Sequence, residues 1–320
     1  MFDPDKSESP RCLVLTDGRR GIENQALGLA ERCAGLRPLN IQSHHIKYGK
    51  AVAALPPKAQ LRLAKFDLPN CEIAIGCGRQ AMSALLYLKR KHPNVMTVYI
   101  QDPRMDPSAF DLVIAPQHDD VRGPNVETMI GSPNRVTEAK IIGERSSFAE
   151  DLKTLTAPRA ALLIGGTSKT HRLDKASHRA HLEAAQTLAA AGYSLLITTS
   201  RRTPDFAALA WKGFASDKKA VWLYDGQGPN PYFAFLGGAD VILVTEDSTN
   251  MLTESCATGK PVYRLPMSGQ AGKFQKLYDA LENRCGAARY SGQLGGDNYA
   301  PLDETARMAD ALWRRFDARG

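Results

Sequence analysis

The stretch DVILVTEDSTNMLTESCATGKPVYR, residues 240–264, decides the fold class because it holds a complete strand–helix–strand pattern. The apolar run at 240–244 predicts a strand, residues 249–258 predict a helix, and residues 261–264 predict a second strand. A continuous apolar run is typical of a strand that is covered on both faces of a parallel sheet. The stretch therefore predicts a βαβ unit of an α/β protein.

The same alternation of strands and helices continues outward from this stretch to both ends of the chain. In the second half, further strands are expected at 160–164, 194–198 and 220–224, with helices at 175–191, 204–212, 231–237 and 272–283. In the first half, strands are expected at 11–16, 40–46, 72–76, 95–100, 111–115 and 126–130, with helices at 23–34 and 79–91. Two such series predict two Rossmann-like, doubly wound domains.

The rhythm breaks only once, and this break sets the expected domain boundaries. We expect an N-terminal domain at residues 1–140, a linker at 141–158 and a C-terminal domain at 159–300. Residues 301–320 are expected to form a final helix.

Composition and charge exclude several classes of protein. The 320 residues include 43% hydrophobic residues, and 41 basic against 34 acidic residues give a net charge of +7, which suits an anionic ligand. No nucleic-acid-binding motif is present. The six cysteines form no CxxC pair, so we expect no metal site and a reduced, cytoplasmic protein. The N-terminal segment MFDPDKSESPR lacks the apolar region of a secretory signal, and no window is long and apolar enough for a membrane helix.

Three loops in the second half suit a phosphate, because each follows a strand and is rich in glycine, hydroxyl or arginine residues. The alternative for each loop alone is a helix cap or a turn. The residues predicted to bind a nucleotide or its phosphates are Gly165, Gly166, Thr167, Ser168, Ser200, Arg201, Arg202, Thr245, Asp247, Ser248, Thr249, Asn250 and Glu254. Glu254 lies within a helix, where a carboxylate can accept hydrogen bonds from a ribose diol.

Polar clusters also follow the strands of the first half. The residues predicted to line this second site are Gly18, Gly21, Glu23, Asn24, Gln25, Gly76, Gly78, Arg79 and Gln101. Asp17, Asp102 and His118 are the candidate general bases, and a structural role for the histidine is equally compatible with the sequence. The segment GCGRQA at 76–81 also matches a dinucleotide-binding pattern, although it does not follow the first strand of its domain.

Several sequence blocks together resemble the mitochondrial-fission family named for elongated mitochondria, including its bacterial members. The blocks are TDGRRGIENQALGLA (16–30), GCGRQA (76–81), QDPR (101–104), FDLVIAPQHD (110–119), IGGTS (164–168), TTSRRTP (198–204), NPYFAFLGGAD (230–240) and TEDSTNMLTESCATGKPVY (245–263). That family is in turn similar to type-B glycosyltransferases, in which two Rossmann-like domains face a cleft. The resemblance implies that the final helix, within residues 301–320, packs back on the N-terminal domain as it does in that fold.

The resemblance implies a function. It implies a nucleotide-sugar donor on the C-terminal domain, with Ser248 and Thr249 at phosphate and Glu254 at ribose, and an acceptor on the N-terminal domain. It implies no cofactor, no metal and no nucleic acid, and it leaves open a lipid or envelope-saccharide acceptor with peripheral contact to the inner face of the cytoplasmic membrane. A non-catalytic recruiting module is the alternative, and a nucleotide-sugar epimerase or nicotinamide enzyme is a further one. The acidic pair Glu246–Asp247 departs from the transferase pattern, where small residues are usual.

Overall fold

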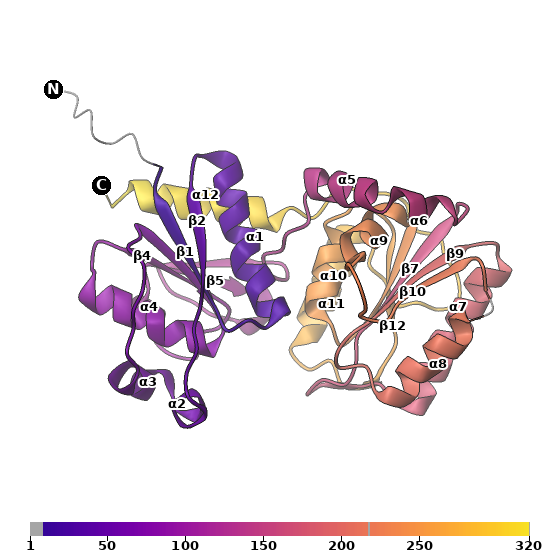
Figure 1. Ribbon diagram of the computed structural model, residues 1–320, viewed down its shortest axis with the longest axis horizontal. Coiled ribbons are helices and arrows are strands. Elements are labelled where there is room, and N and C mark those ends of the chain that lie inside the picture. The colour runs from indigo at the N-terminus through magenta and orange to yellow at the C-terminus, as the bar shows by residue number, and fades with distance from the viewer. Residues whose placement is uncertain (1–8, 217, 320) are drawn as a thin grey trace. The chain divides into compact units, whose positions relative to one another are not determined.

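The computed structural model describes residues 9–216 and 218–319, and it divides into two compact units. Unit 1 comprises the residues up to Arg135 together with those from Asp303 onward, and unit 2 comprises Val136–Leu302. Each unit is built around its own parallel β-sheet (Figure 1). The first eight residues, which include most of the segment judged to lack a secretory signal, lie outside the described residues.

The sheet of unit 1 has six parallel strands in the order β2-β1-β3-β4-β5-β6. Its strands are β1 (Arg11–Thr16), β2 (Asn40–His45), β3 (Ile73–Cys77), β4 (Met96–Ile100), β5 (Leu112–Pro116) and β6 (Val126–Met129). Its α-helices are α1 (Arg20–Leu36), α2 (Lys50–Ala54), α3 (Pro57–Leu63), α4 (Arg79–Lys91) and α12 (Glu304–Asp317). Strands β1, β3, β4 and β5 are almost wholly buried, as their continuous apolar sequences predict.

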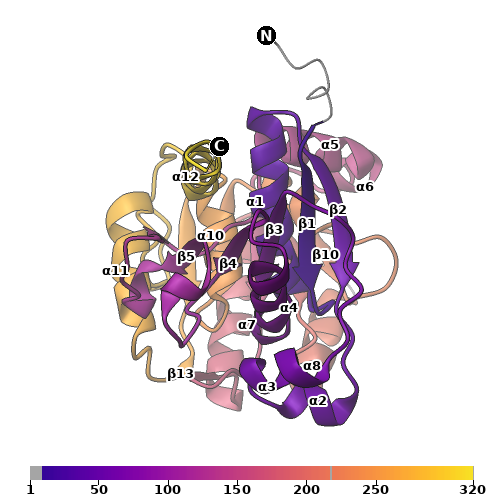
Figure 2. The same ribbon diagram turned by 90° about the vertical axis from the view of Figure 1, so that its left-hand side faces the viewer.

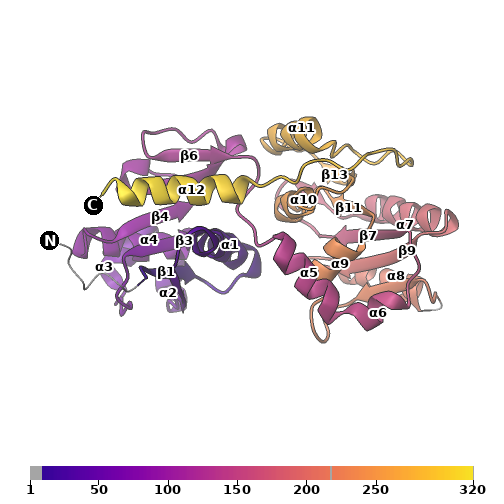
Figure 3. The same ribbon diagram turned by 90° about the horizontal axis from the view of Figure 1, so that it is seen from above.

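Helices cover both faces of this sheet. Helices α1 and α12 form one core with the sheet, in which Leu29 and Leu312 are fully buried, and α4 covers the other face (Figures 2 and 3). The indole N–H of Trp313 donates to the Cys33 carbonyl at 3.1 Å, and the Asn134 N–H donates to Thr305 Oγ1 at 3.1 Å. The last helix of the chain is therefore part of the hydrophobic core of unit 1.

Unit 2 has a five-stranded parallel sheet in the order β10-β9-β7-β11-β12. Strands β8 and β13 form a separate two-stranded antiparallel sheet. The strands are β7 (Arg159–Ile164), β8 (His171–Arg172), β9 (Ser194–Thr199), β10 (Val221–Tyr224), β11 (Val241–Thr245), β12 (Val262–Leu265) and β13 (Ser268–Gly269). The helices are α5 (Glu138–Ser147), α6 (Ala149–Lys153), α7 (Lys175–Ala190), α8 (Asp205–Ala215), α9 (Tyr232–Gly238), α10 (Thr249–Cys256) and α11 (Phe274–Cys285). Helices α7 and α8 pack on one face of the sheet, and α9, α10 and α11 lie on the other (Figure 1).

Two parallel sheets with helices on both faces confirm the predicted α/β class with two doubly wound domains. Most predicted elements are present, and their ends differ by up to three residues, as for α1, which begins at Arg20 instead of at residue 23. Helices α2 and α3 were not predicted, because five and seven residues are too few to show a helical period. Most of residues 141–158, expected as a linker, lies in α5 and α6, which belong to unit 2. Within the described residues, no helix has the length and apolar character needed to cross a membrane.

Candidate functional site

The candidate site of unit 2 lies at the point where the chain reverses direction across the sheet. Strand β7 pairs with β9 on one side and with β11 on the other, so the connections leaving β7 and β11 run in opposite directions. In doubly wound sheets this reversal leaves room for a ligand beyond the carboxyl ends of the two strands. The loops that follow β7 and β11 contain Gly165–Ser168 and Asp247–Ser248, both of which were predicted to lie at a phosphate.

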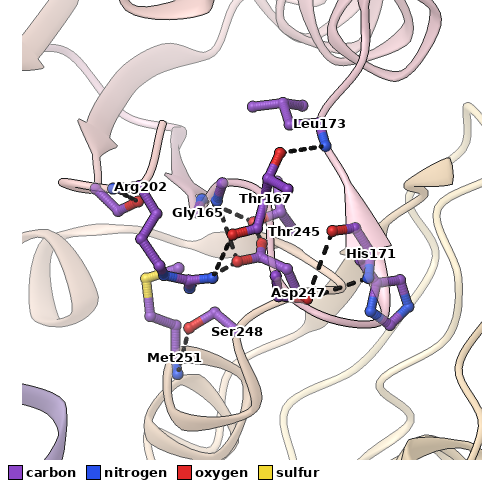
Figure 4. Close-up of polar contacts among 12 residues, drawn as sticks. Gly165, Thr167, His171, Leu173, Arg202, Thr245, Asp247, Ser248 and Met251 are labelled. Carbon is purple, nitrogen blue, oxygen red and sulfur yellow. Dashed lines mark hydrogen bonds and ion pairs between the residues drawn. The ribbon is translucent and has the colours of Figure 1, made fainter. Parts of the chain in front are cut away.

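The Asp247 side chain links these two loops and is fully buried. Its Oδ2 accepts a hydrogen bond from the Gly166 N–H at 3.0 Å and pairs with Arg202 Nη2 at 2.7 Å. Its Oδ1 accepts from Thr245 Oγ1 at 2.7 Å, and the same hydroxyl oxygen accepts from the Gly165 N–H at 2.8 Å (Figure 4). The Gly166 N–H was predicted to bind a phosphate. In the structure it donates instead to the Asp247 carboxylate of the same chain.

Both glycines of this loop are required by close packing. A Cβ on Gly165 would lie 2.2 Å from Asp247 Oδ1, and a Cβ on Gly166 would lie 2.0 Å from the Arg202 carbonyl oxygen. Neither distance is compatible with a side chain in this arrangement. The glycines consequently bring the loop after β7 against the loops after β9 and β11.

The loop after β9 joins the same cluster through its hydroxyl groups. Thr203 Oγ1 donates to the Gly165 carbonyl at 2.5 Å and accepts from the Ser200 N–H at 2.9 Å. Ser200 Oγ in turn accepts from the Arg202 N–H at 3.1 Å, which closes the turn. The Arg201 side chain is exposed. Unlike Arg202, it forms no ion pair with any of the described residues. Thr203 was not predicted as a site residue, although it lies in the TTSRRTP block.

The N-terminus of α10 begins directly after Asp247. Ser248 is the N-cap residue, and its Oγ accepts from the Met251 N–H at 3.4 Å. Thr249 and Asn250 form the first turn and are partly exposed, so the positive end of the helix dipole is accessible there. These three predicted residues lie together at one helix end.

Glu254 lies one and a half turns further along α10 and is buried. Its Oε2 accepts a hydrogen bond from the Tyr232 hydroxyl at 2.5 Å. Burial raises the pKa of the Glu254 carboxyl to about 7, and the hydrogen bond from Tyr232 opposes this shift. Sequence reasoning missed Tyr232, whose only signal was its place in the NPYFAFLGGAD block.

In unit 1 the equivalent reversal lies between β1 and β3, and the loop after β1 is open. Asp17 Oδ2 pairs with Arg19 Nη2 at 2.6 Å, while the Arg19 side chain is 65% exposed. Gly18 has a φ of +77°, and the nearest atom to a Cβ placed on it would be His45 Cε1 at 4.0 Å. Gly21 is exposed, and Asn24 is partly exposed in the first turns of α1.

A small polar cluster connects helix α1 to the ends of strands β3 and β4. Gln25 Oε1 accepts from Gln101 Nε2 and from Cys77 Sγ, both at 3.3 Å. Gln101 has a φ of +94°, a strained conformation for a residue with a side chain, and such strain gathers at functional sites. The structure therefore brings together the predicted residues Gln25 and Gln101 at the carboxyl edge of the sheet.

The three candidate bases follow β1, β4 and β5. Each of them contacts a residue one or two positions away in the sequence. Asp102 Oδ1 accepts from the Arg104 N–H at 2.7 Å. His118 is buried, with its Nε2 3.8 Å from Asp119 Oδ1. Asp17 is held by Arg19, as described above.

The remaining predicted residues of unit 1 have structural contacts. A Cβ on Gly76 would lie 2.9 Å from Leu85 Cδ1, and Gly78 begins α4 with a φ of +82°. Arg79 Nη2 donates to the Ala53 carbonyl at 2.7 Å, and Glu23 Oε1 lies 3.1 Å from His45 Nε2. The guanidinium of Arg79 is therefore engaged by the backbone of α2.

Comparison with known proteins identifies the family. The model of the mitochondrial fission ELM1 family matches residues 20–316. The chain belongs to this family. It is 27% identical over 275 residues to the mitochondrial fission protein ELM1 of Arabidopsis thaliana, covering 78% of this chain and 64% of the plant protein. It is 24% identical over 346 residues to an uncharacterised protein of Rickettsia prowazekii, covering 93% of this chain and 96% of that protein.

Solved structures with a similar fold include enzymes that act on nucleotide sugars. The UDP-GlcNAc 2-epimerase of Methanocaldococcus jannaschii is 11% identical with a TM-score of 0.56, covering 96% of this chain and 100% of that chain. The complex of S. aureus MnaA with UDP is 11% identical with a TM-score of 0.52, covering 97% and 90%. At this level of identity the likeness concerns the fold, and it confirms the expected resemblance to the type-B glycosyltransferase architecture.

Proposed function

We propose that this chain binds a nucleotide-activated sugar on unit 2 and transfers the sugar to a cell-envelope acceptor held by unit 1. The observation that supports the proposal is the polar cluster at the chain reversal of unit 2, where three strand-end loops meet the N-terminus of α10. The fold shared with enzymes that act on nucleotide sugars supports the same ligand class. The reaction is proposed to take place at the cytoplasmic face of the membrane, with a lipid or saccharide acceptor.

The proposed donor site combines the N-terminus of α10, the two arginines of the loop after β9 and the pair formed by Tyr232 and Glu254. The diphosphate would bind Ser248, Thr249 and Asn250 at the positive end of α10, with Arg201 and Arg202 as cationic partners. Glu254 and Tyr232 would bind the ribose hydroxyls. Thr167 is exposed and Ser168 partly exposed at the rim of the same edge, so their hydroxyls complete the proposed phosphate site.

The chemistry that this arrangement supports is displacement at the anomeric carbon. A base among Asp17, Asp102 and His118 takes the proton of an acceptor hydroxyl. The acceptor oxygen forms a bond to the anomeric carbon, and the bond from that carbon to the phosphate oxygen breaks. The nucleoside diphosphate leaves with the bonding electrons, and the arginines and the α10 dipole stabilise its negative charge.

A second candidate function is a non-catalytic recruiting module. The Asp247 contacts favour it, because the buried carboxylate already occupies the Gly166 donor and pairs with Arg202. In such a module the cluster would serve stability alone.

Ligand-dependent thermal stabilisation distinguishes these functions. Purified protein is melted with nucleoside mono- and diphosphates, UDP-GlcNAc and other nucleotide sugars, and NAD, each at millimolar concentration. A ligand at 100 times its dissociation constant adds about 2.7 kcal/mol to the free energy of unfolding, which shifts the melting temperature measurably. A shift with one family of nucleotide sugars supports the proposal, and a shift with NAD alone supports a nicotinamide enzyme. The absence of any shift supports the recruiting module.

Two variants locate the binding site if a nucleotide shifts the melting temperature. Glu254→Gln is expected to weaken binding of nucleosides and nucleotides alike, because it changes the ribose contact. Arg201→Ala is expected to weaken binding of diphosphates selectively. Glu150→Gln is the matched control, since the Glu150 side chain is 86% exposed on α6. Affinities unchanged in both test variants would remove the site from this edge of unit 2.

A further inference from the structure

A cavity of about 240 Å³ in unit 2 lies outside the cluster described above. Its walls come from the loop after β11, from β12, α11, the antiparallel pair β8 and β13, and the segment after α11. They include Arg264, Arg289, Glu246, His171 and Tyr278. Liquid water occupies about 30 Å³ per molecule, so the cavity has room for more than a few waters.

Arg264 is a buried cation with donors that lack a partner. The residue is 5% exposed, and its Nη2 pairs with Glu282 Oε2 at 2.8 Å. Its Nε and Nη1 have no hydrogen-bond partner within the described part of the chain. Unsatisfied buried donors of a charged group are costly, and an arginine binds planar oxyanions well. An oxyanion in the cavity would supply this partner after a small shift of the wall, because both nitrogens are shielded from solvent.

The other polar groups of the cavity are already engaged. Glu246 accepts from the Met267 N–H at 3.0 Å and from Arg289 Nε at 3.1 Å, which neutralises its carboxylate. Tyr278 donates to the Glu246 carbonyl at 2.7 Å, so its oxygen accepts from His171 Nε2 at 3.3 Å.

His171 Nδ1 lies 3.0 Å from Thr170 Oγ1, and either of these two atoms can be the donor. Burial lowers the pKa of His171, in keeping with a neutral ring. The charged side chains in the wall are thus Arg264, Arg289 and Glu246. Since Arg264 also pairs with Glu282, the two arginines and the two glutamates carry no net charge.

We propose that this cavity is an oxyanion site, which binds a phosphate or carboxylate group through Arg264 and Arg289. The group can belong to free phosphate or to an acidic substituent of the sugar that the protein carries. The second source rests on the proposed function, and it is consistent with the chain order, because Glu246 in the cavity wall immediately precedes Asp247. An acidic sugar would then be distinguished from a neutral one by the two arginines.

Inorganic phosphate tests the site without any nucleotide. Phosphate binding is measured by calorimetry at low ionic strength for the full chain and for Arg264→Gln, Arg289→Gln and Arg264→Lys. We expect at least tenfold weaker binding in Arg264→Gln, partial recovery in Arg264→Lys, and weaker binding in Arg289→Gln, whose side chain is 58% exposed and therefore tolerant of change. Arg90→Gln, an exposed arginine on α4, removes the same charge from unit 1 and is expected to bind as the unchanged chain does.

A pair of nucleotide sugars distinguishes the two sources of the anion. If the site binds an acidic sugar, UDP-glucuronate will bind at least tenfold more tightly than UDP-glucose, and Arg264→Gln will abolish the difference. If the site binds free phosphate, phosphate will bind and the two nucleotide sugars will not differ. Phosphate binding without binding of either nucleotide sugar would contradict the proposed function while supporting the oxyanion site.

Two results would overturn the oxyanion site. One is the absence of both phosphate binding and any preference for the acidic sugar. The other is equal binding by the unchanged chain and by a folded Arg264→Gln variant. Either result would leave Arg264 with only its structural contacts to Glu282 and to the ring of Tyr278, whose centroid is 4.8 Å away.

Discussion

The loops at the two chain reversals differ in how their polar groups are satisfied. In unit 2 the loop after β7 is buried at Gly165 and Gly166, and Asp247 connects it to the loop after β11. In unit 1 the loop after β1 is exposed from Gly18 to Gly21, and Asp17 bonds Arg19, two residues away. Long-range contacts organise the glycine loop of unit 2, whereas Asp17 in the loop after β1 bonds a neighbour in the chain, and the long-range contacts of that edge are made by Glu23 and Gln25. This difference fits a fixed donor site and an acceptor site that changes with its ligand.

Replacing the two aspartates gives the largest expected contrast. Asp247→Ala leaves the Gly166 N–H and the Arg202 guanidinium without their partner, and should lower the free energy of unfolding of unit 2 by about 3–4 kcal/mol. Asp17→Ala in unit 1 loses an ion pair in which the Asp17 side chain is 4% exposed and the Arg19 side chain is 65% exposed. Because the freed arginine is solvated by water, the cost should be smaller, about 1–2 kcal/mol.

Tryptophan fluorescence during urea unfolding follows one unit at a time when the tryptophans of the other unit are replaced by phenylalanine. Trp211 and Trp222 lie in unit 2, and Trp313 lies in unit 1. Equal losses in the two aspartate variants would contradict the contrast between the two loops.

A methyl group on each loop glycine tests the same contrast through packing. Gly166→Ala places a Cβ against the Arg202 backbone, and overpacking of this kind costs about 1–3 kcal/mol. Gly18→Ala meets no atom closer than 4.0 Å and carries only the backbone cost of a positive φ, about 1 kcal/mol. Denaturant unfolding of both variants provides the measurement, and a smaller loss for Gly166→Ala than for Gly18→Ala would show that the unit 2 loop can relax.

The buried carboxyl of unit 2 should make stability depend on pH. The pKa of Glu254 is raised from 4.5 to about 7, so the native state binds a proton that the unfolded state releases between these values. Stability should therefore fall as the pH rises from about 5 to about 8, by about 2–3 kcal/mol, since each pKa unit corresponds to about 1.4 kcal/mol.

Glu254→Gln removes this titration and should lack that part of the pH slope. The free energy of unfolding, measured across this pH range for the unchanged chain and for the variant, gives the comparison. Parallel plots of unfolding free energy against pH for the two proteins would show that Glu254 is ionised throughout. Unit 2 would then not contain the buried protonated carboxyl that distinguishes it from unit 1.

Helix capping gives the smallest expected contrast. Ser248 caps α10 through its side chain, so Ser248→Ala should cost about 1 kcal/mol. Arg19 precedes α1 without a capping bond from its side chain, and Arg19→Ala should change stability by about 0.5 kcal/mol or less. Thermal melting of both variants measures this difference, and a larger loss for Arg19→Ala would mean that the unit 1 loop depends on the pair with Asp17.

The strands and the carboxyl-edge loops could be predicted because they depend on local patterns. Apolar runs at β1, β4 and β7 identified buried strands, and glycine or hydroxyl residues directly after them identified the loops. Helices α2 and α3 could not be predicted, since short helices are stabilised by tertiary packing more than by their own periodicity. Gln60 on α3 shows this packing, because its Nε2 donates to the carbonyls of Ala53 and Leu55.

The partners of the polar residues required the folded structure. The contact between Gly166 and Asp247 joins residues 81 positions apart, and the contact between Tyr232 and Glu254 joins residues 22 positions apart. Local sequence marks a glycine or a carboxylate as available, but it does not tell whether a ligand or another part of the chain satisfies it. The arginine at position 264, within an otherwise apolar strand, was the signal that could have pointed to the cavity.

The amino-acid sequence by itself determined the α/β class, the strand and helix order, and the edge of each sheet where polar residues gather. These features follow from hydrophobic periodicity and turn chemistry over a few residues. Only the tertiary structure decided that Asp247 fills the glycine loop, that Glu254 is paired with Tyr232, and that Arg264 retains unpartnered donors in a cavity. The physical reason is that burial and hydrogen-bond satisfaction depend on which distant segments the fold brings together.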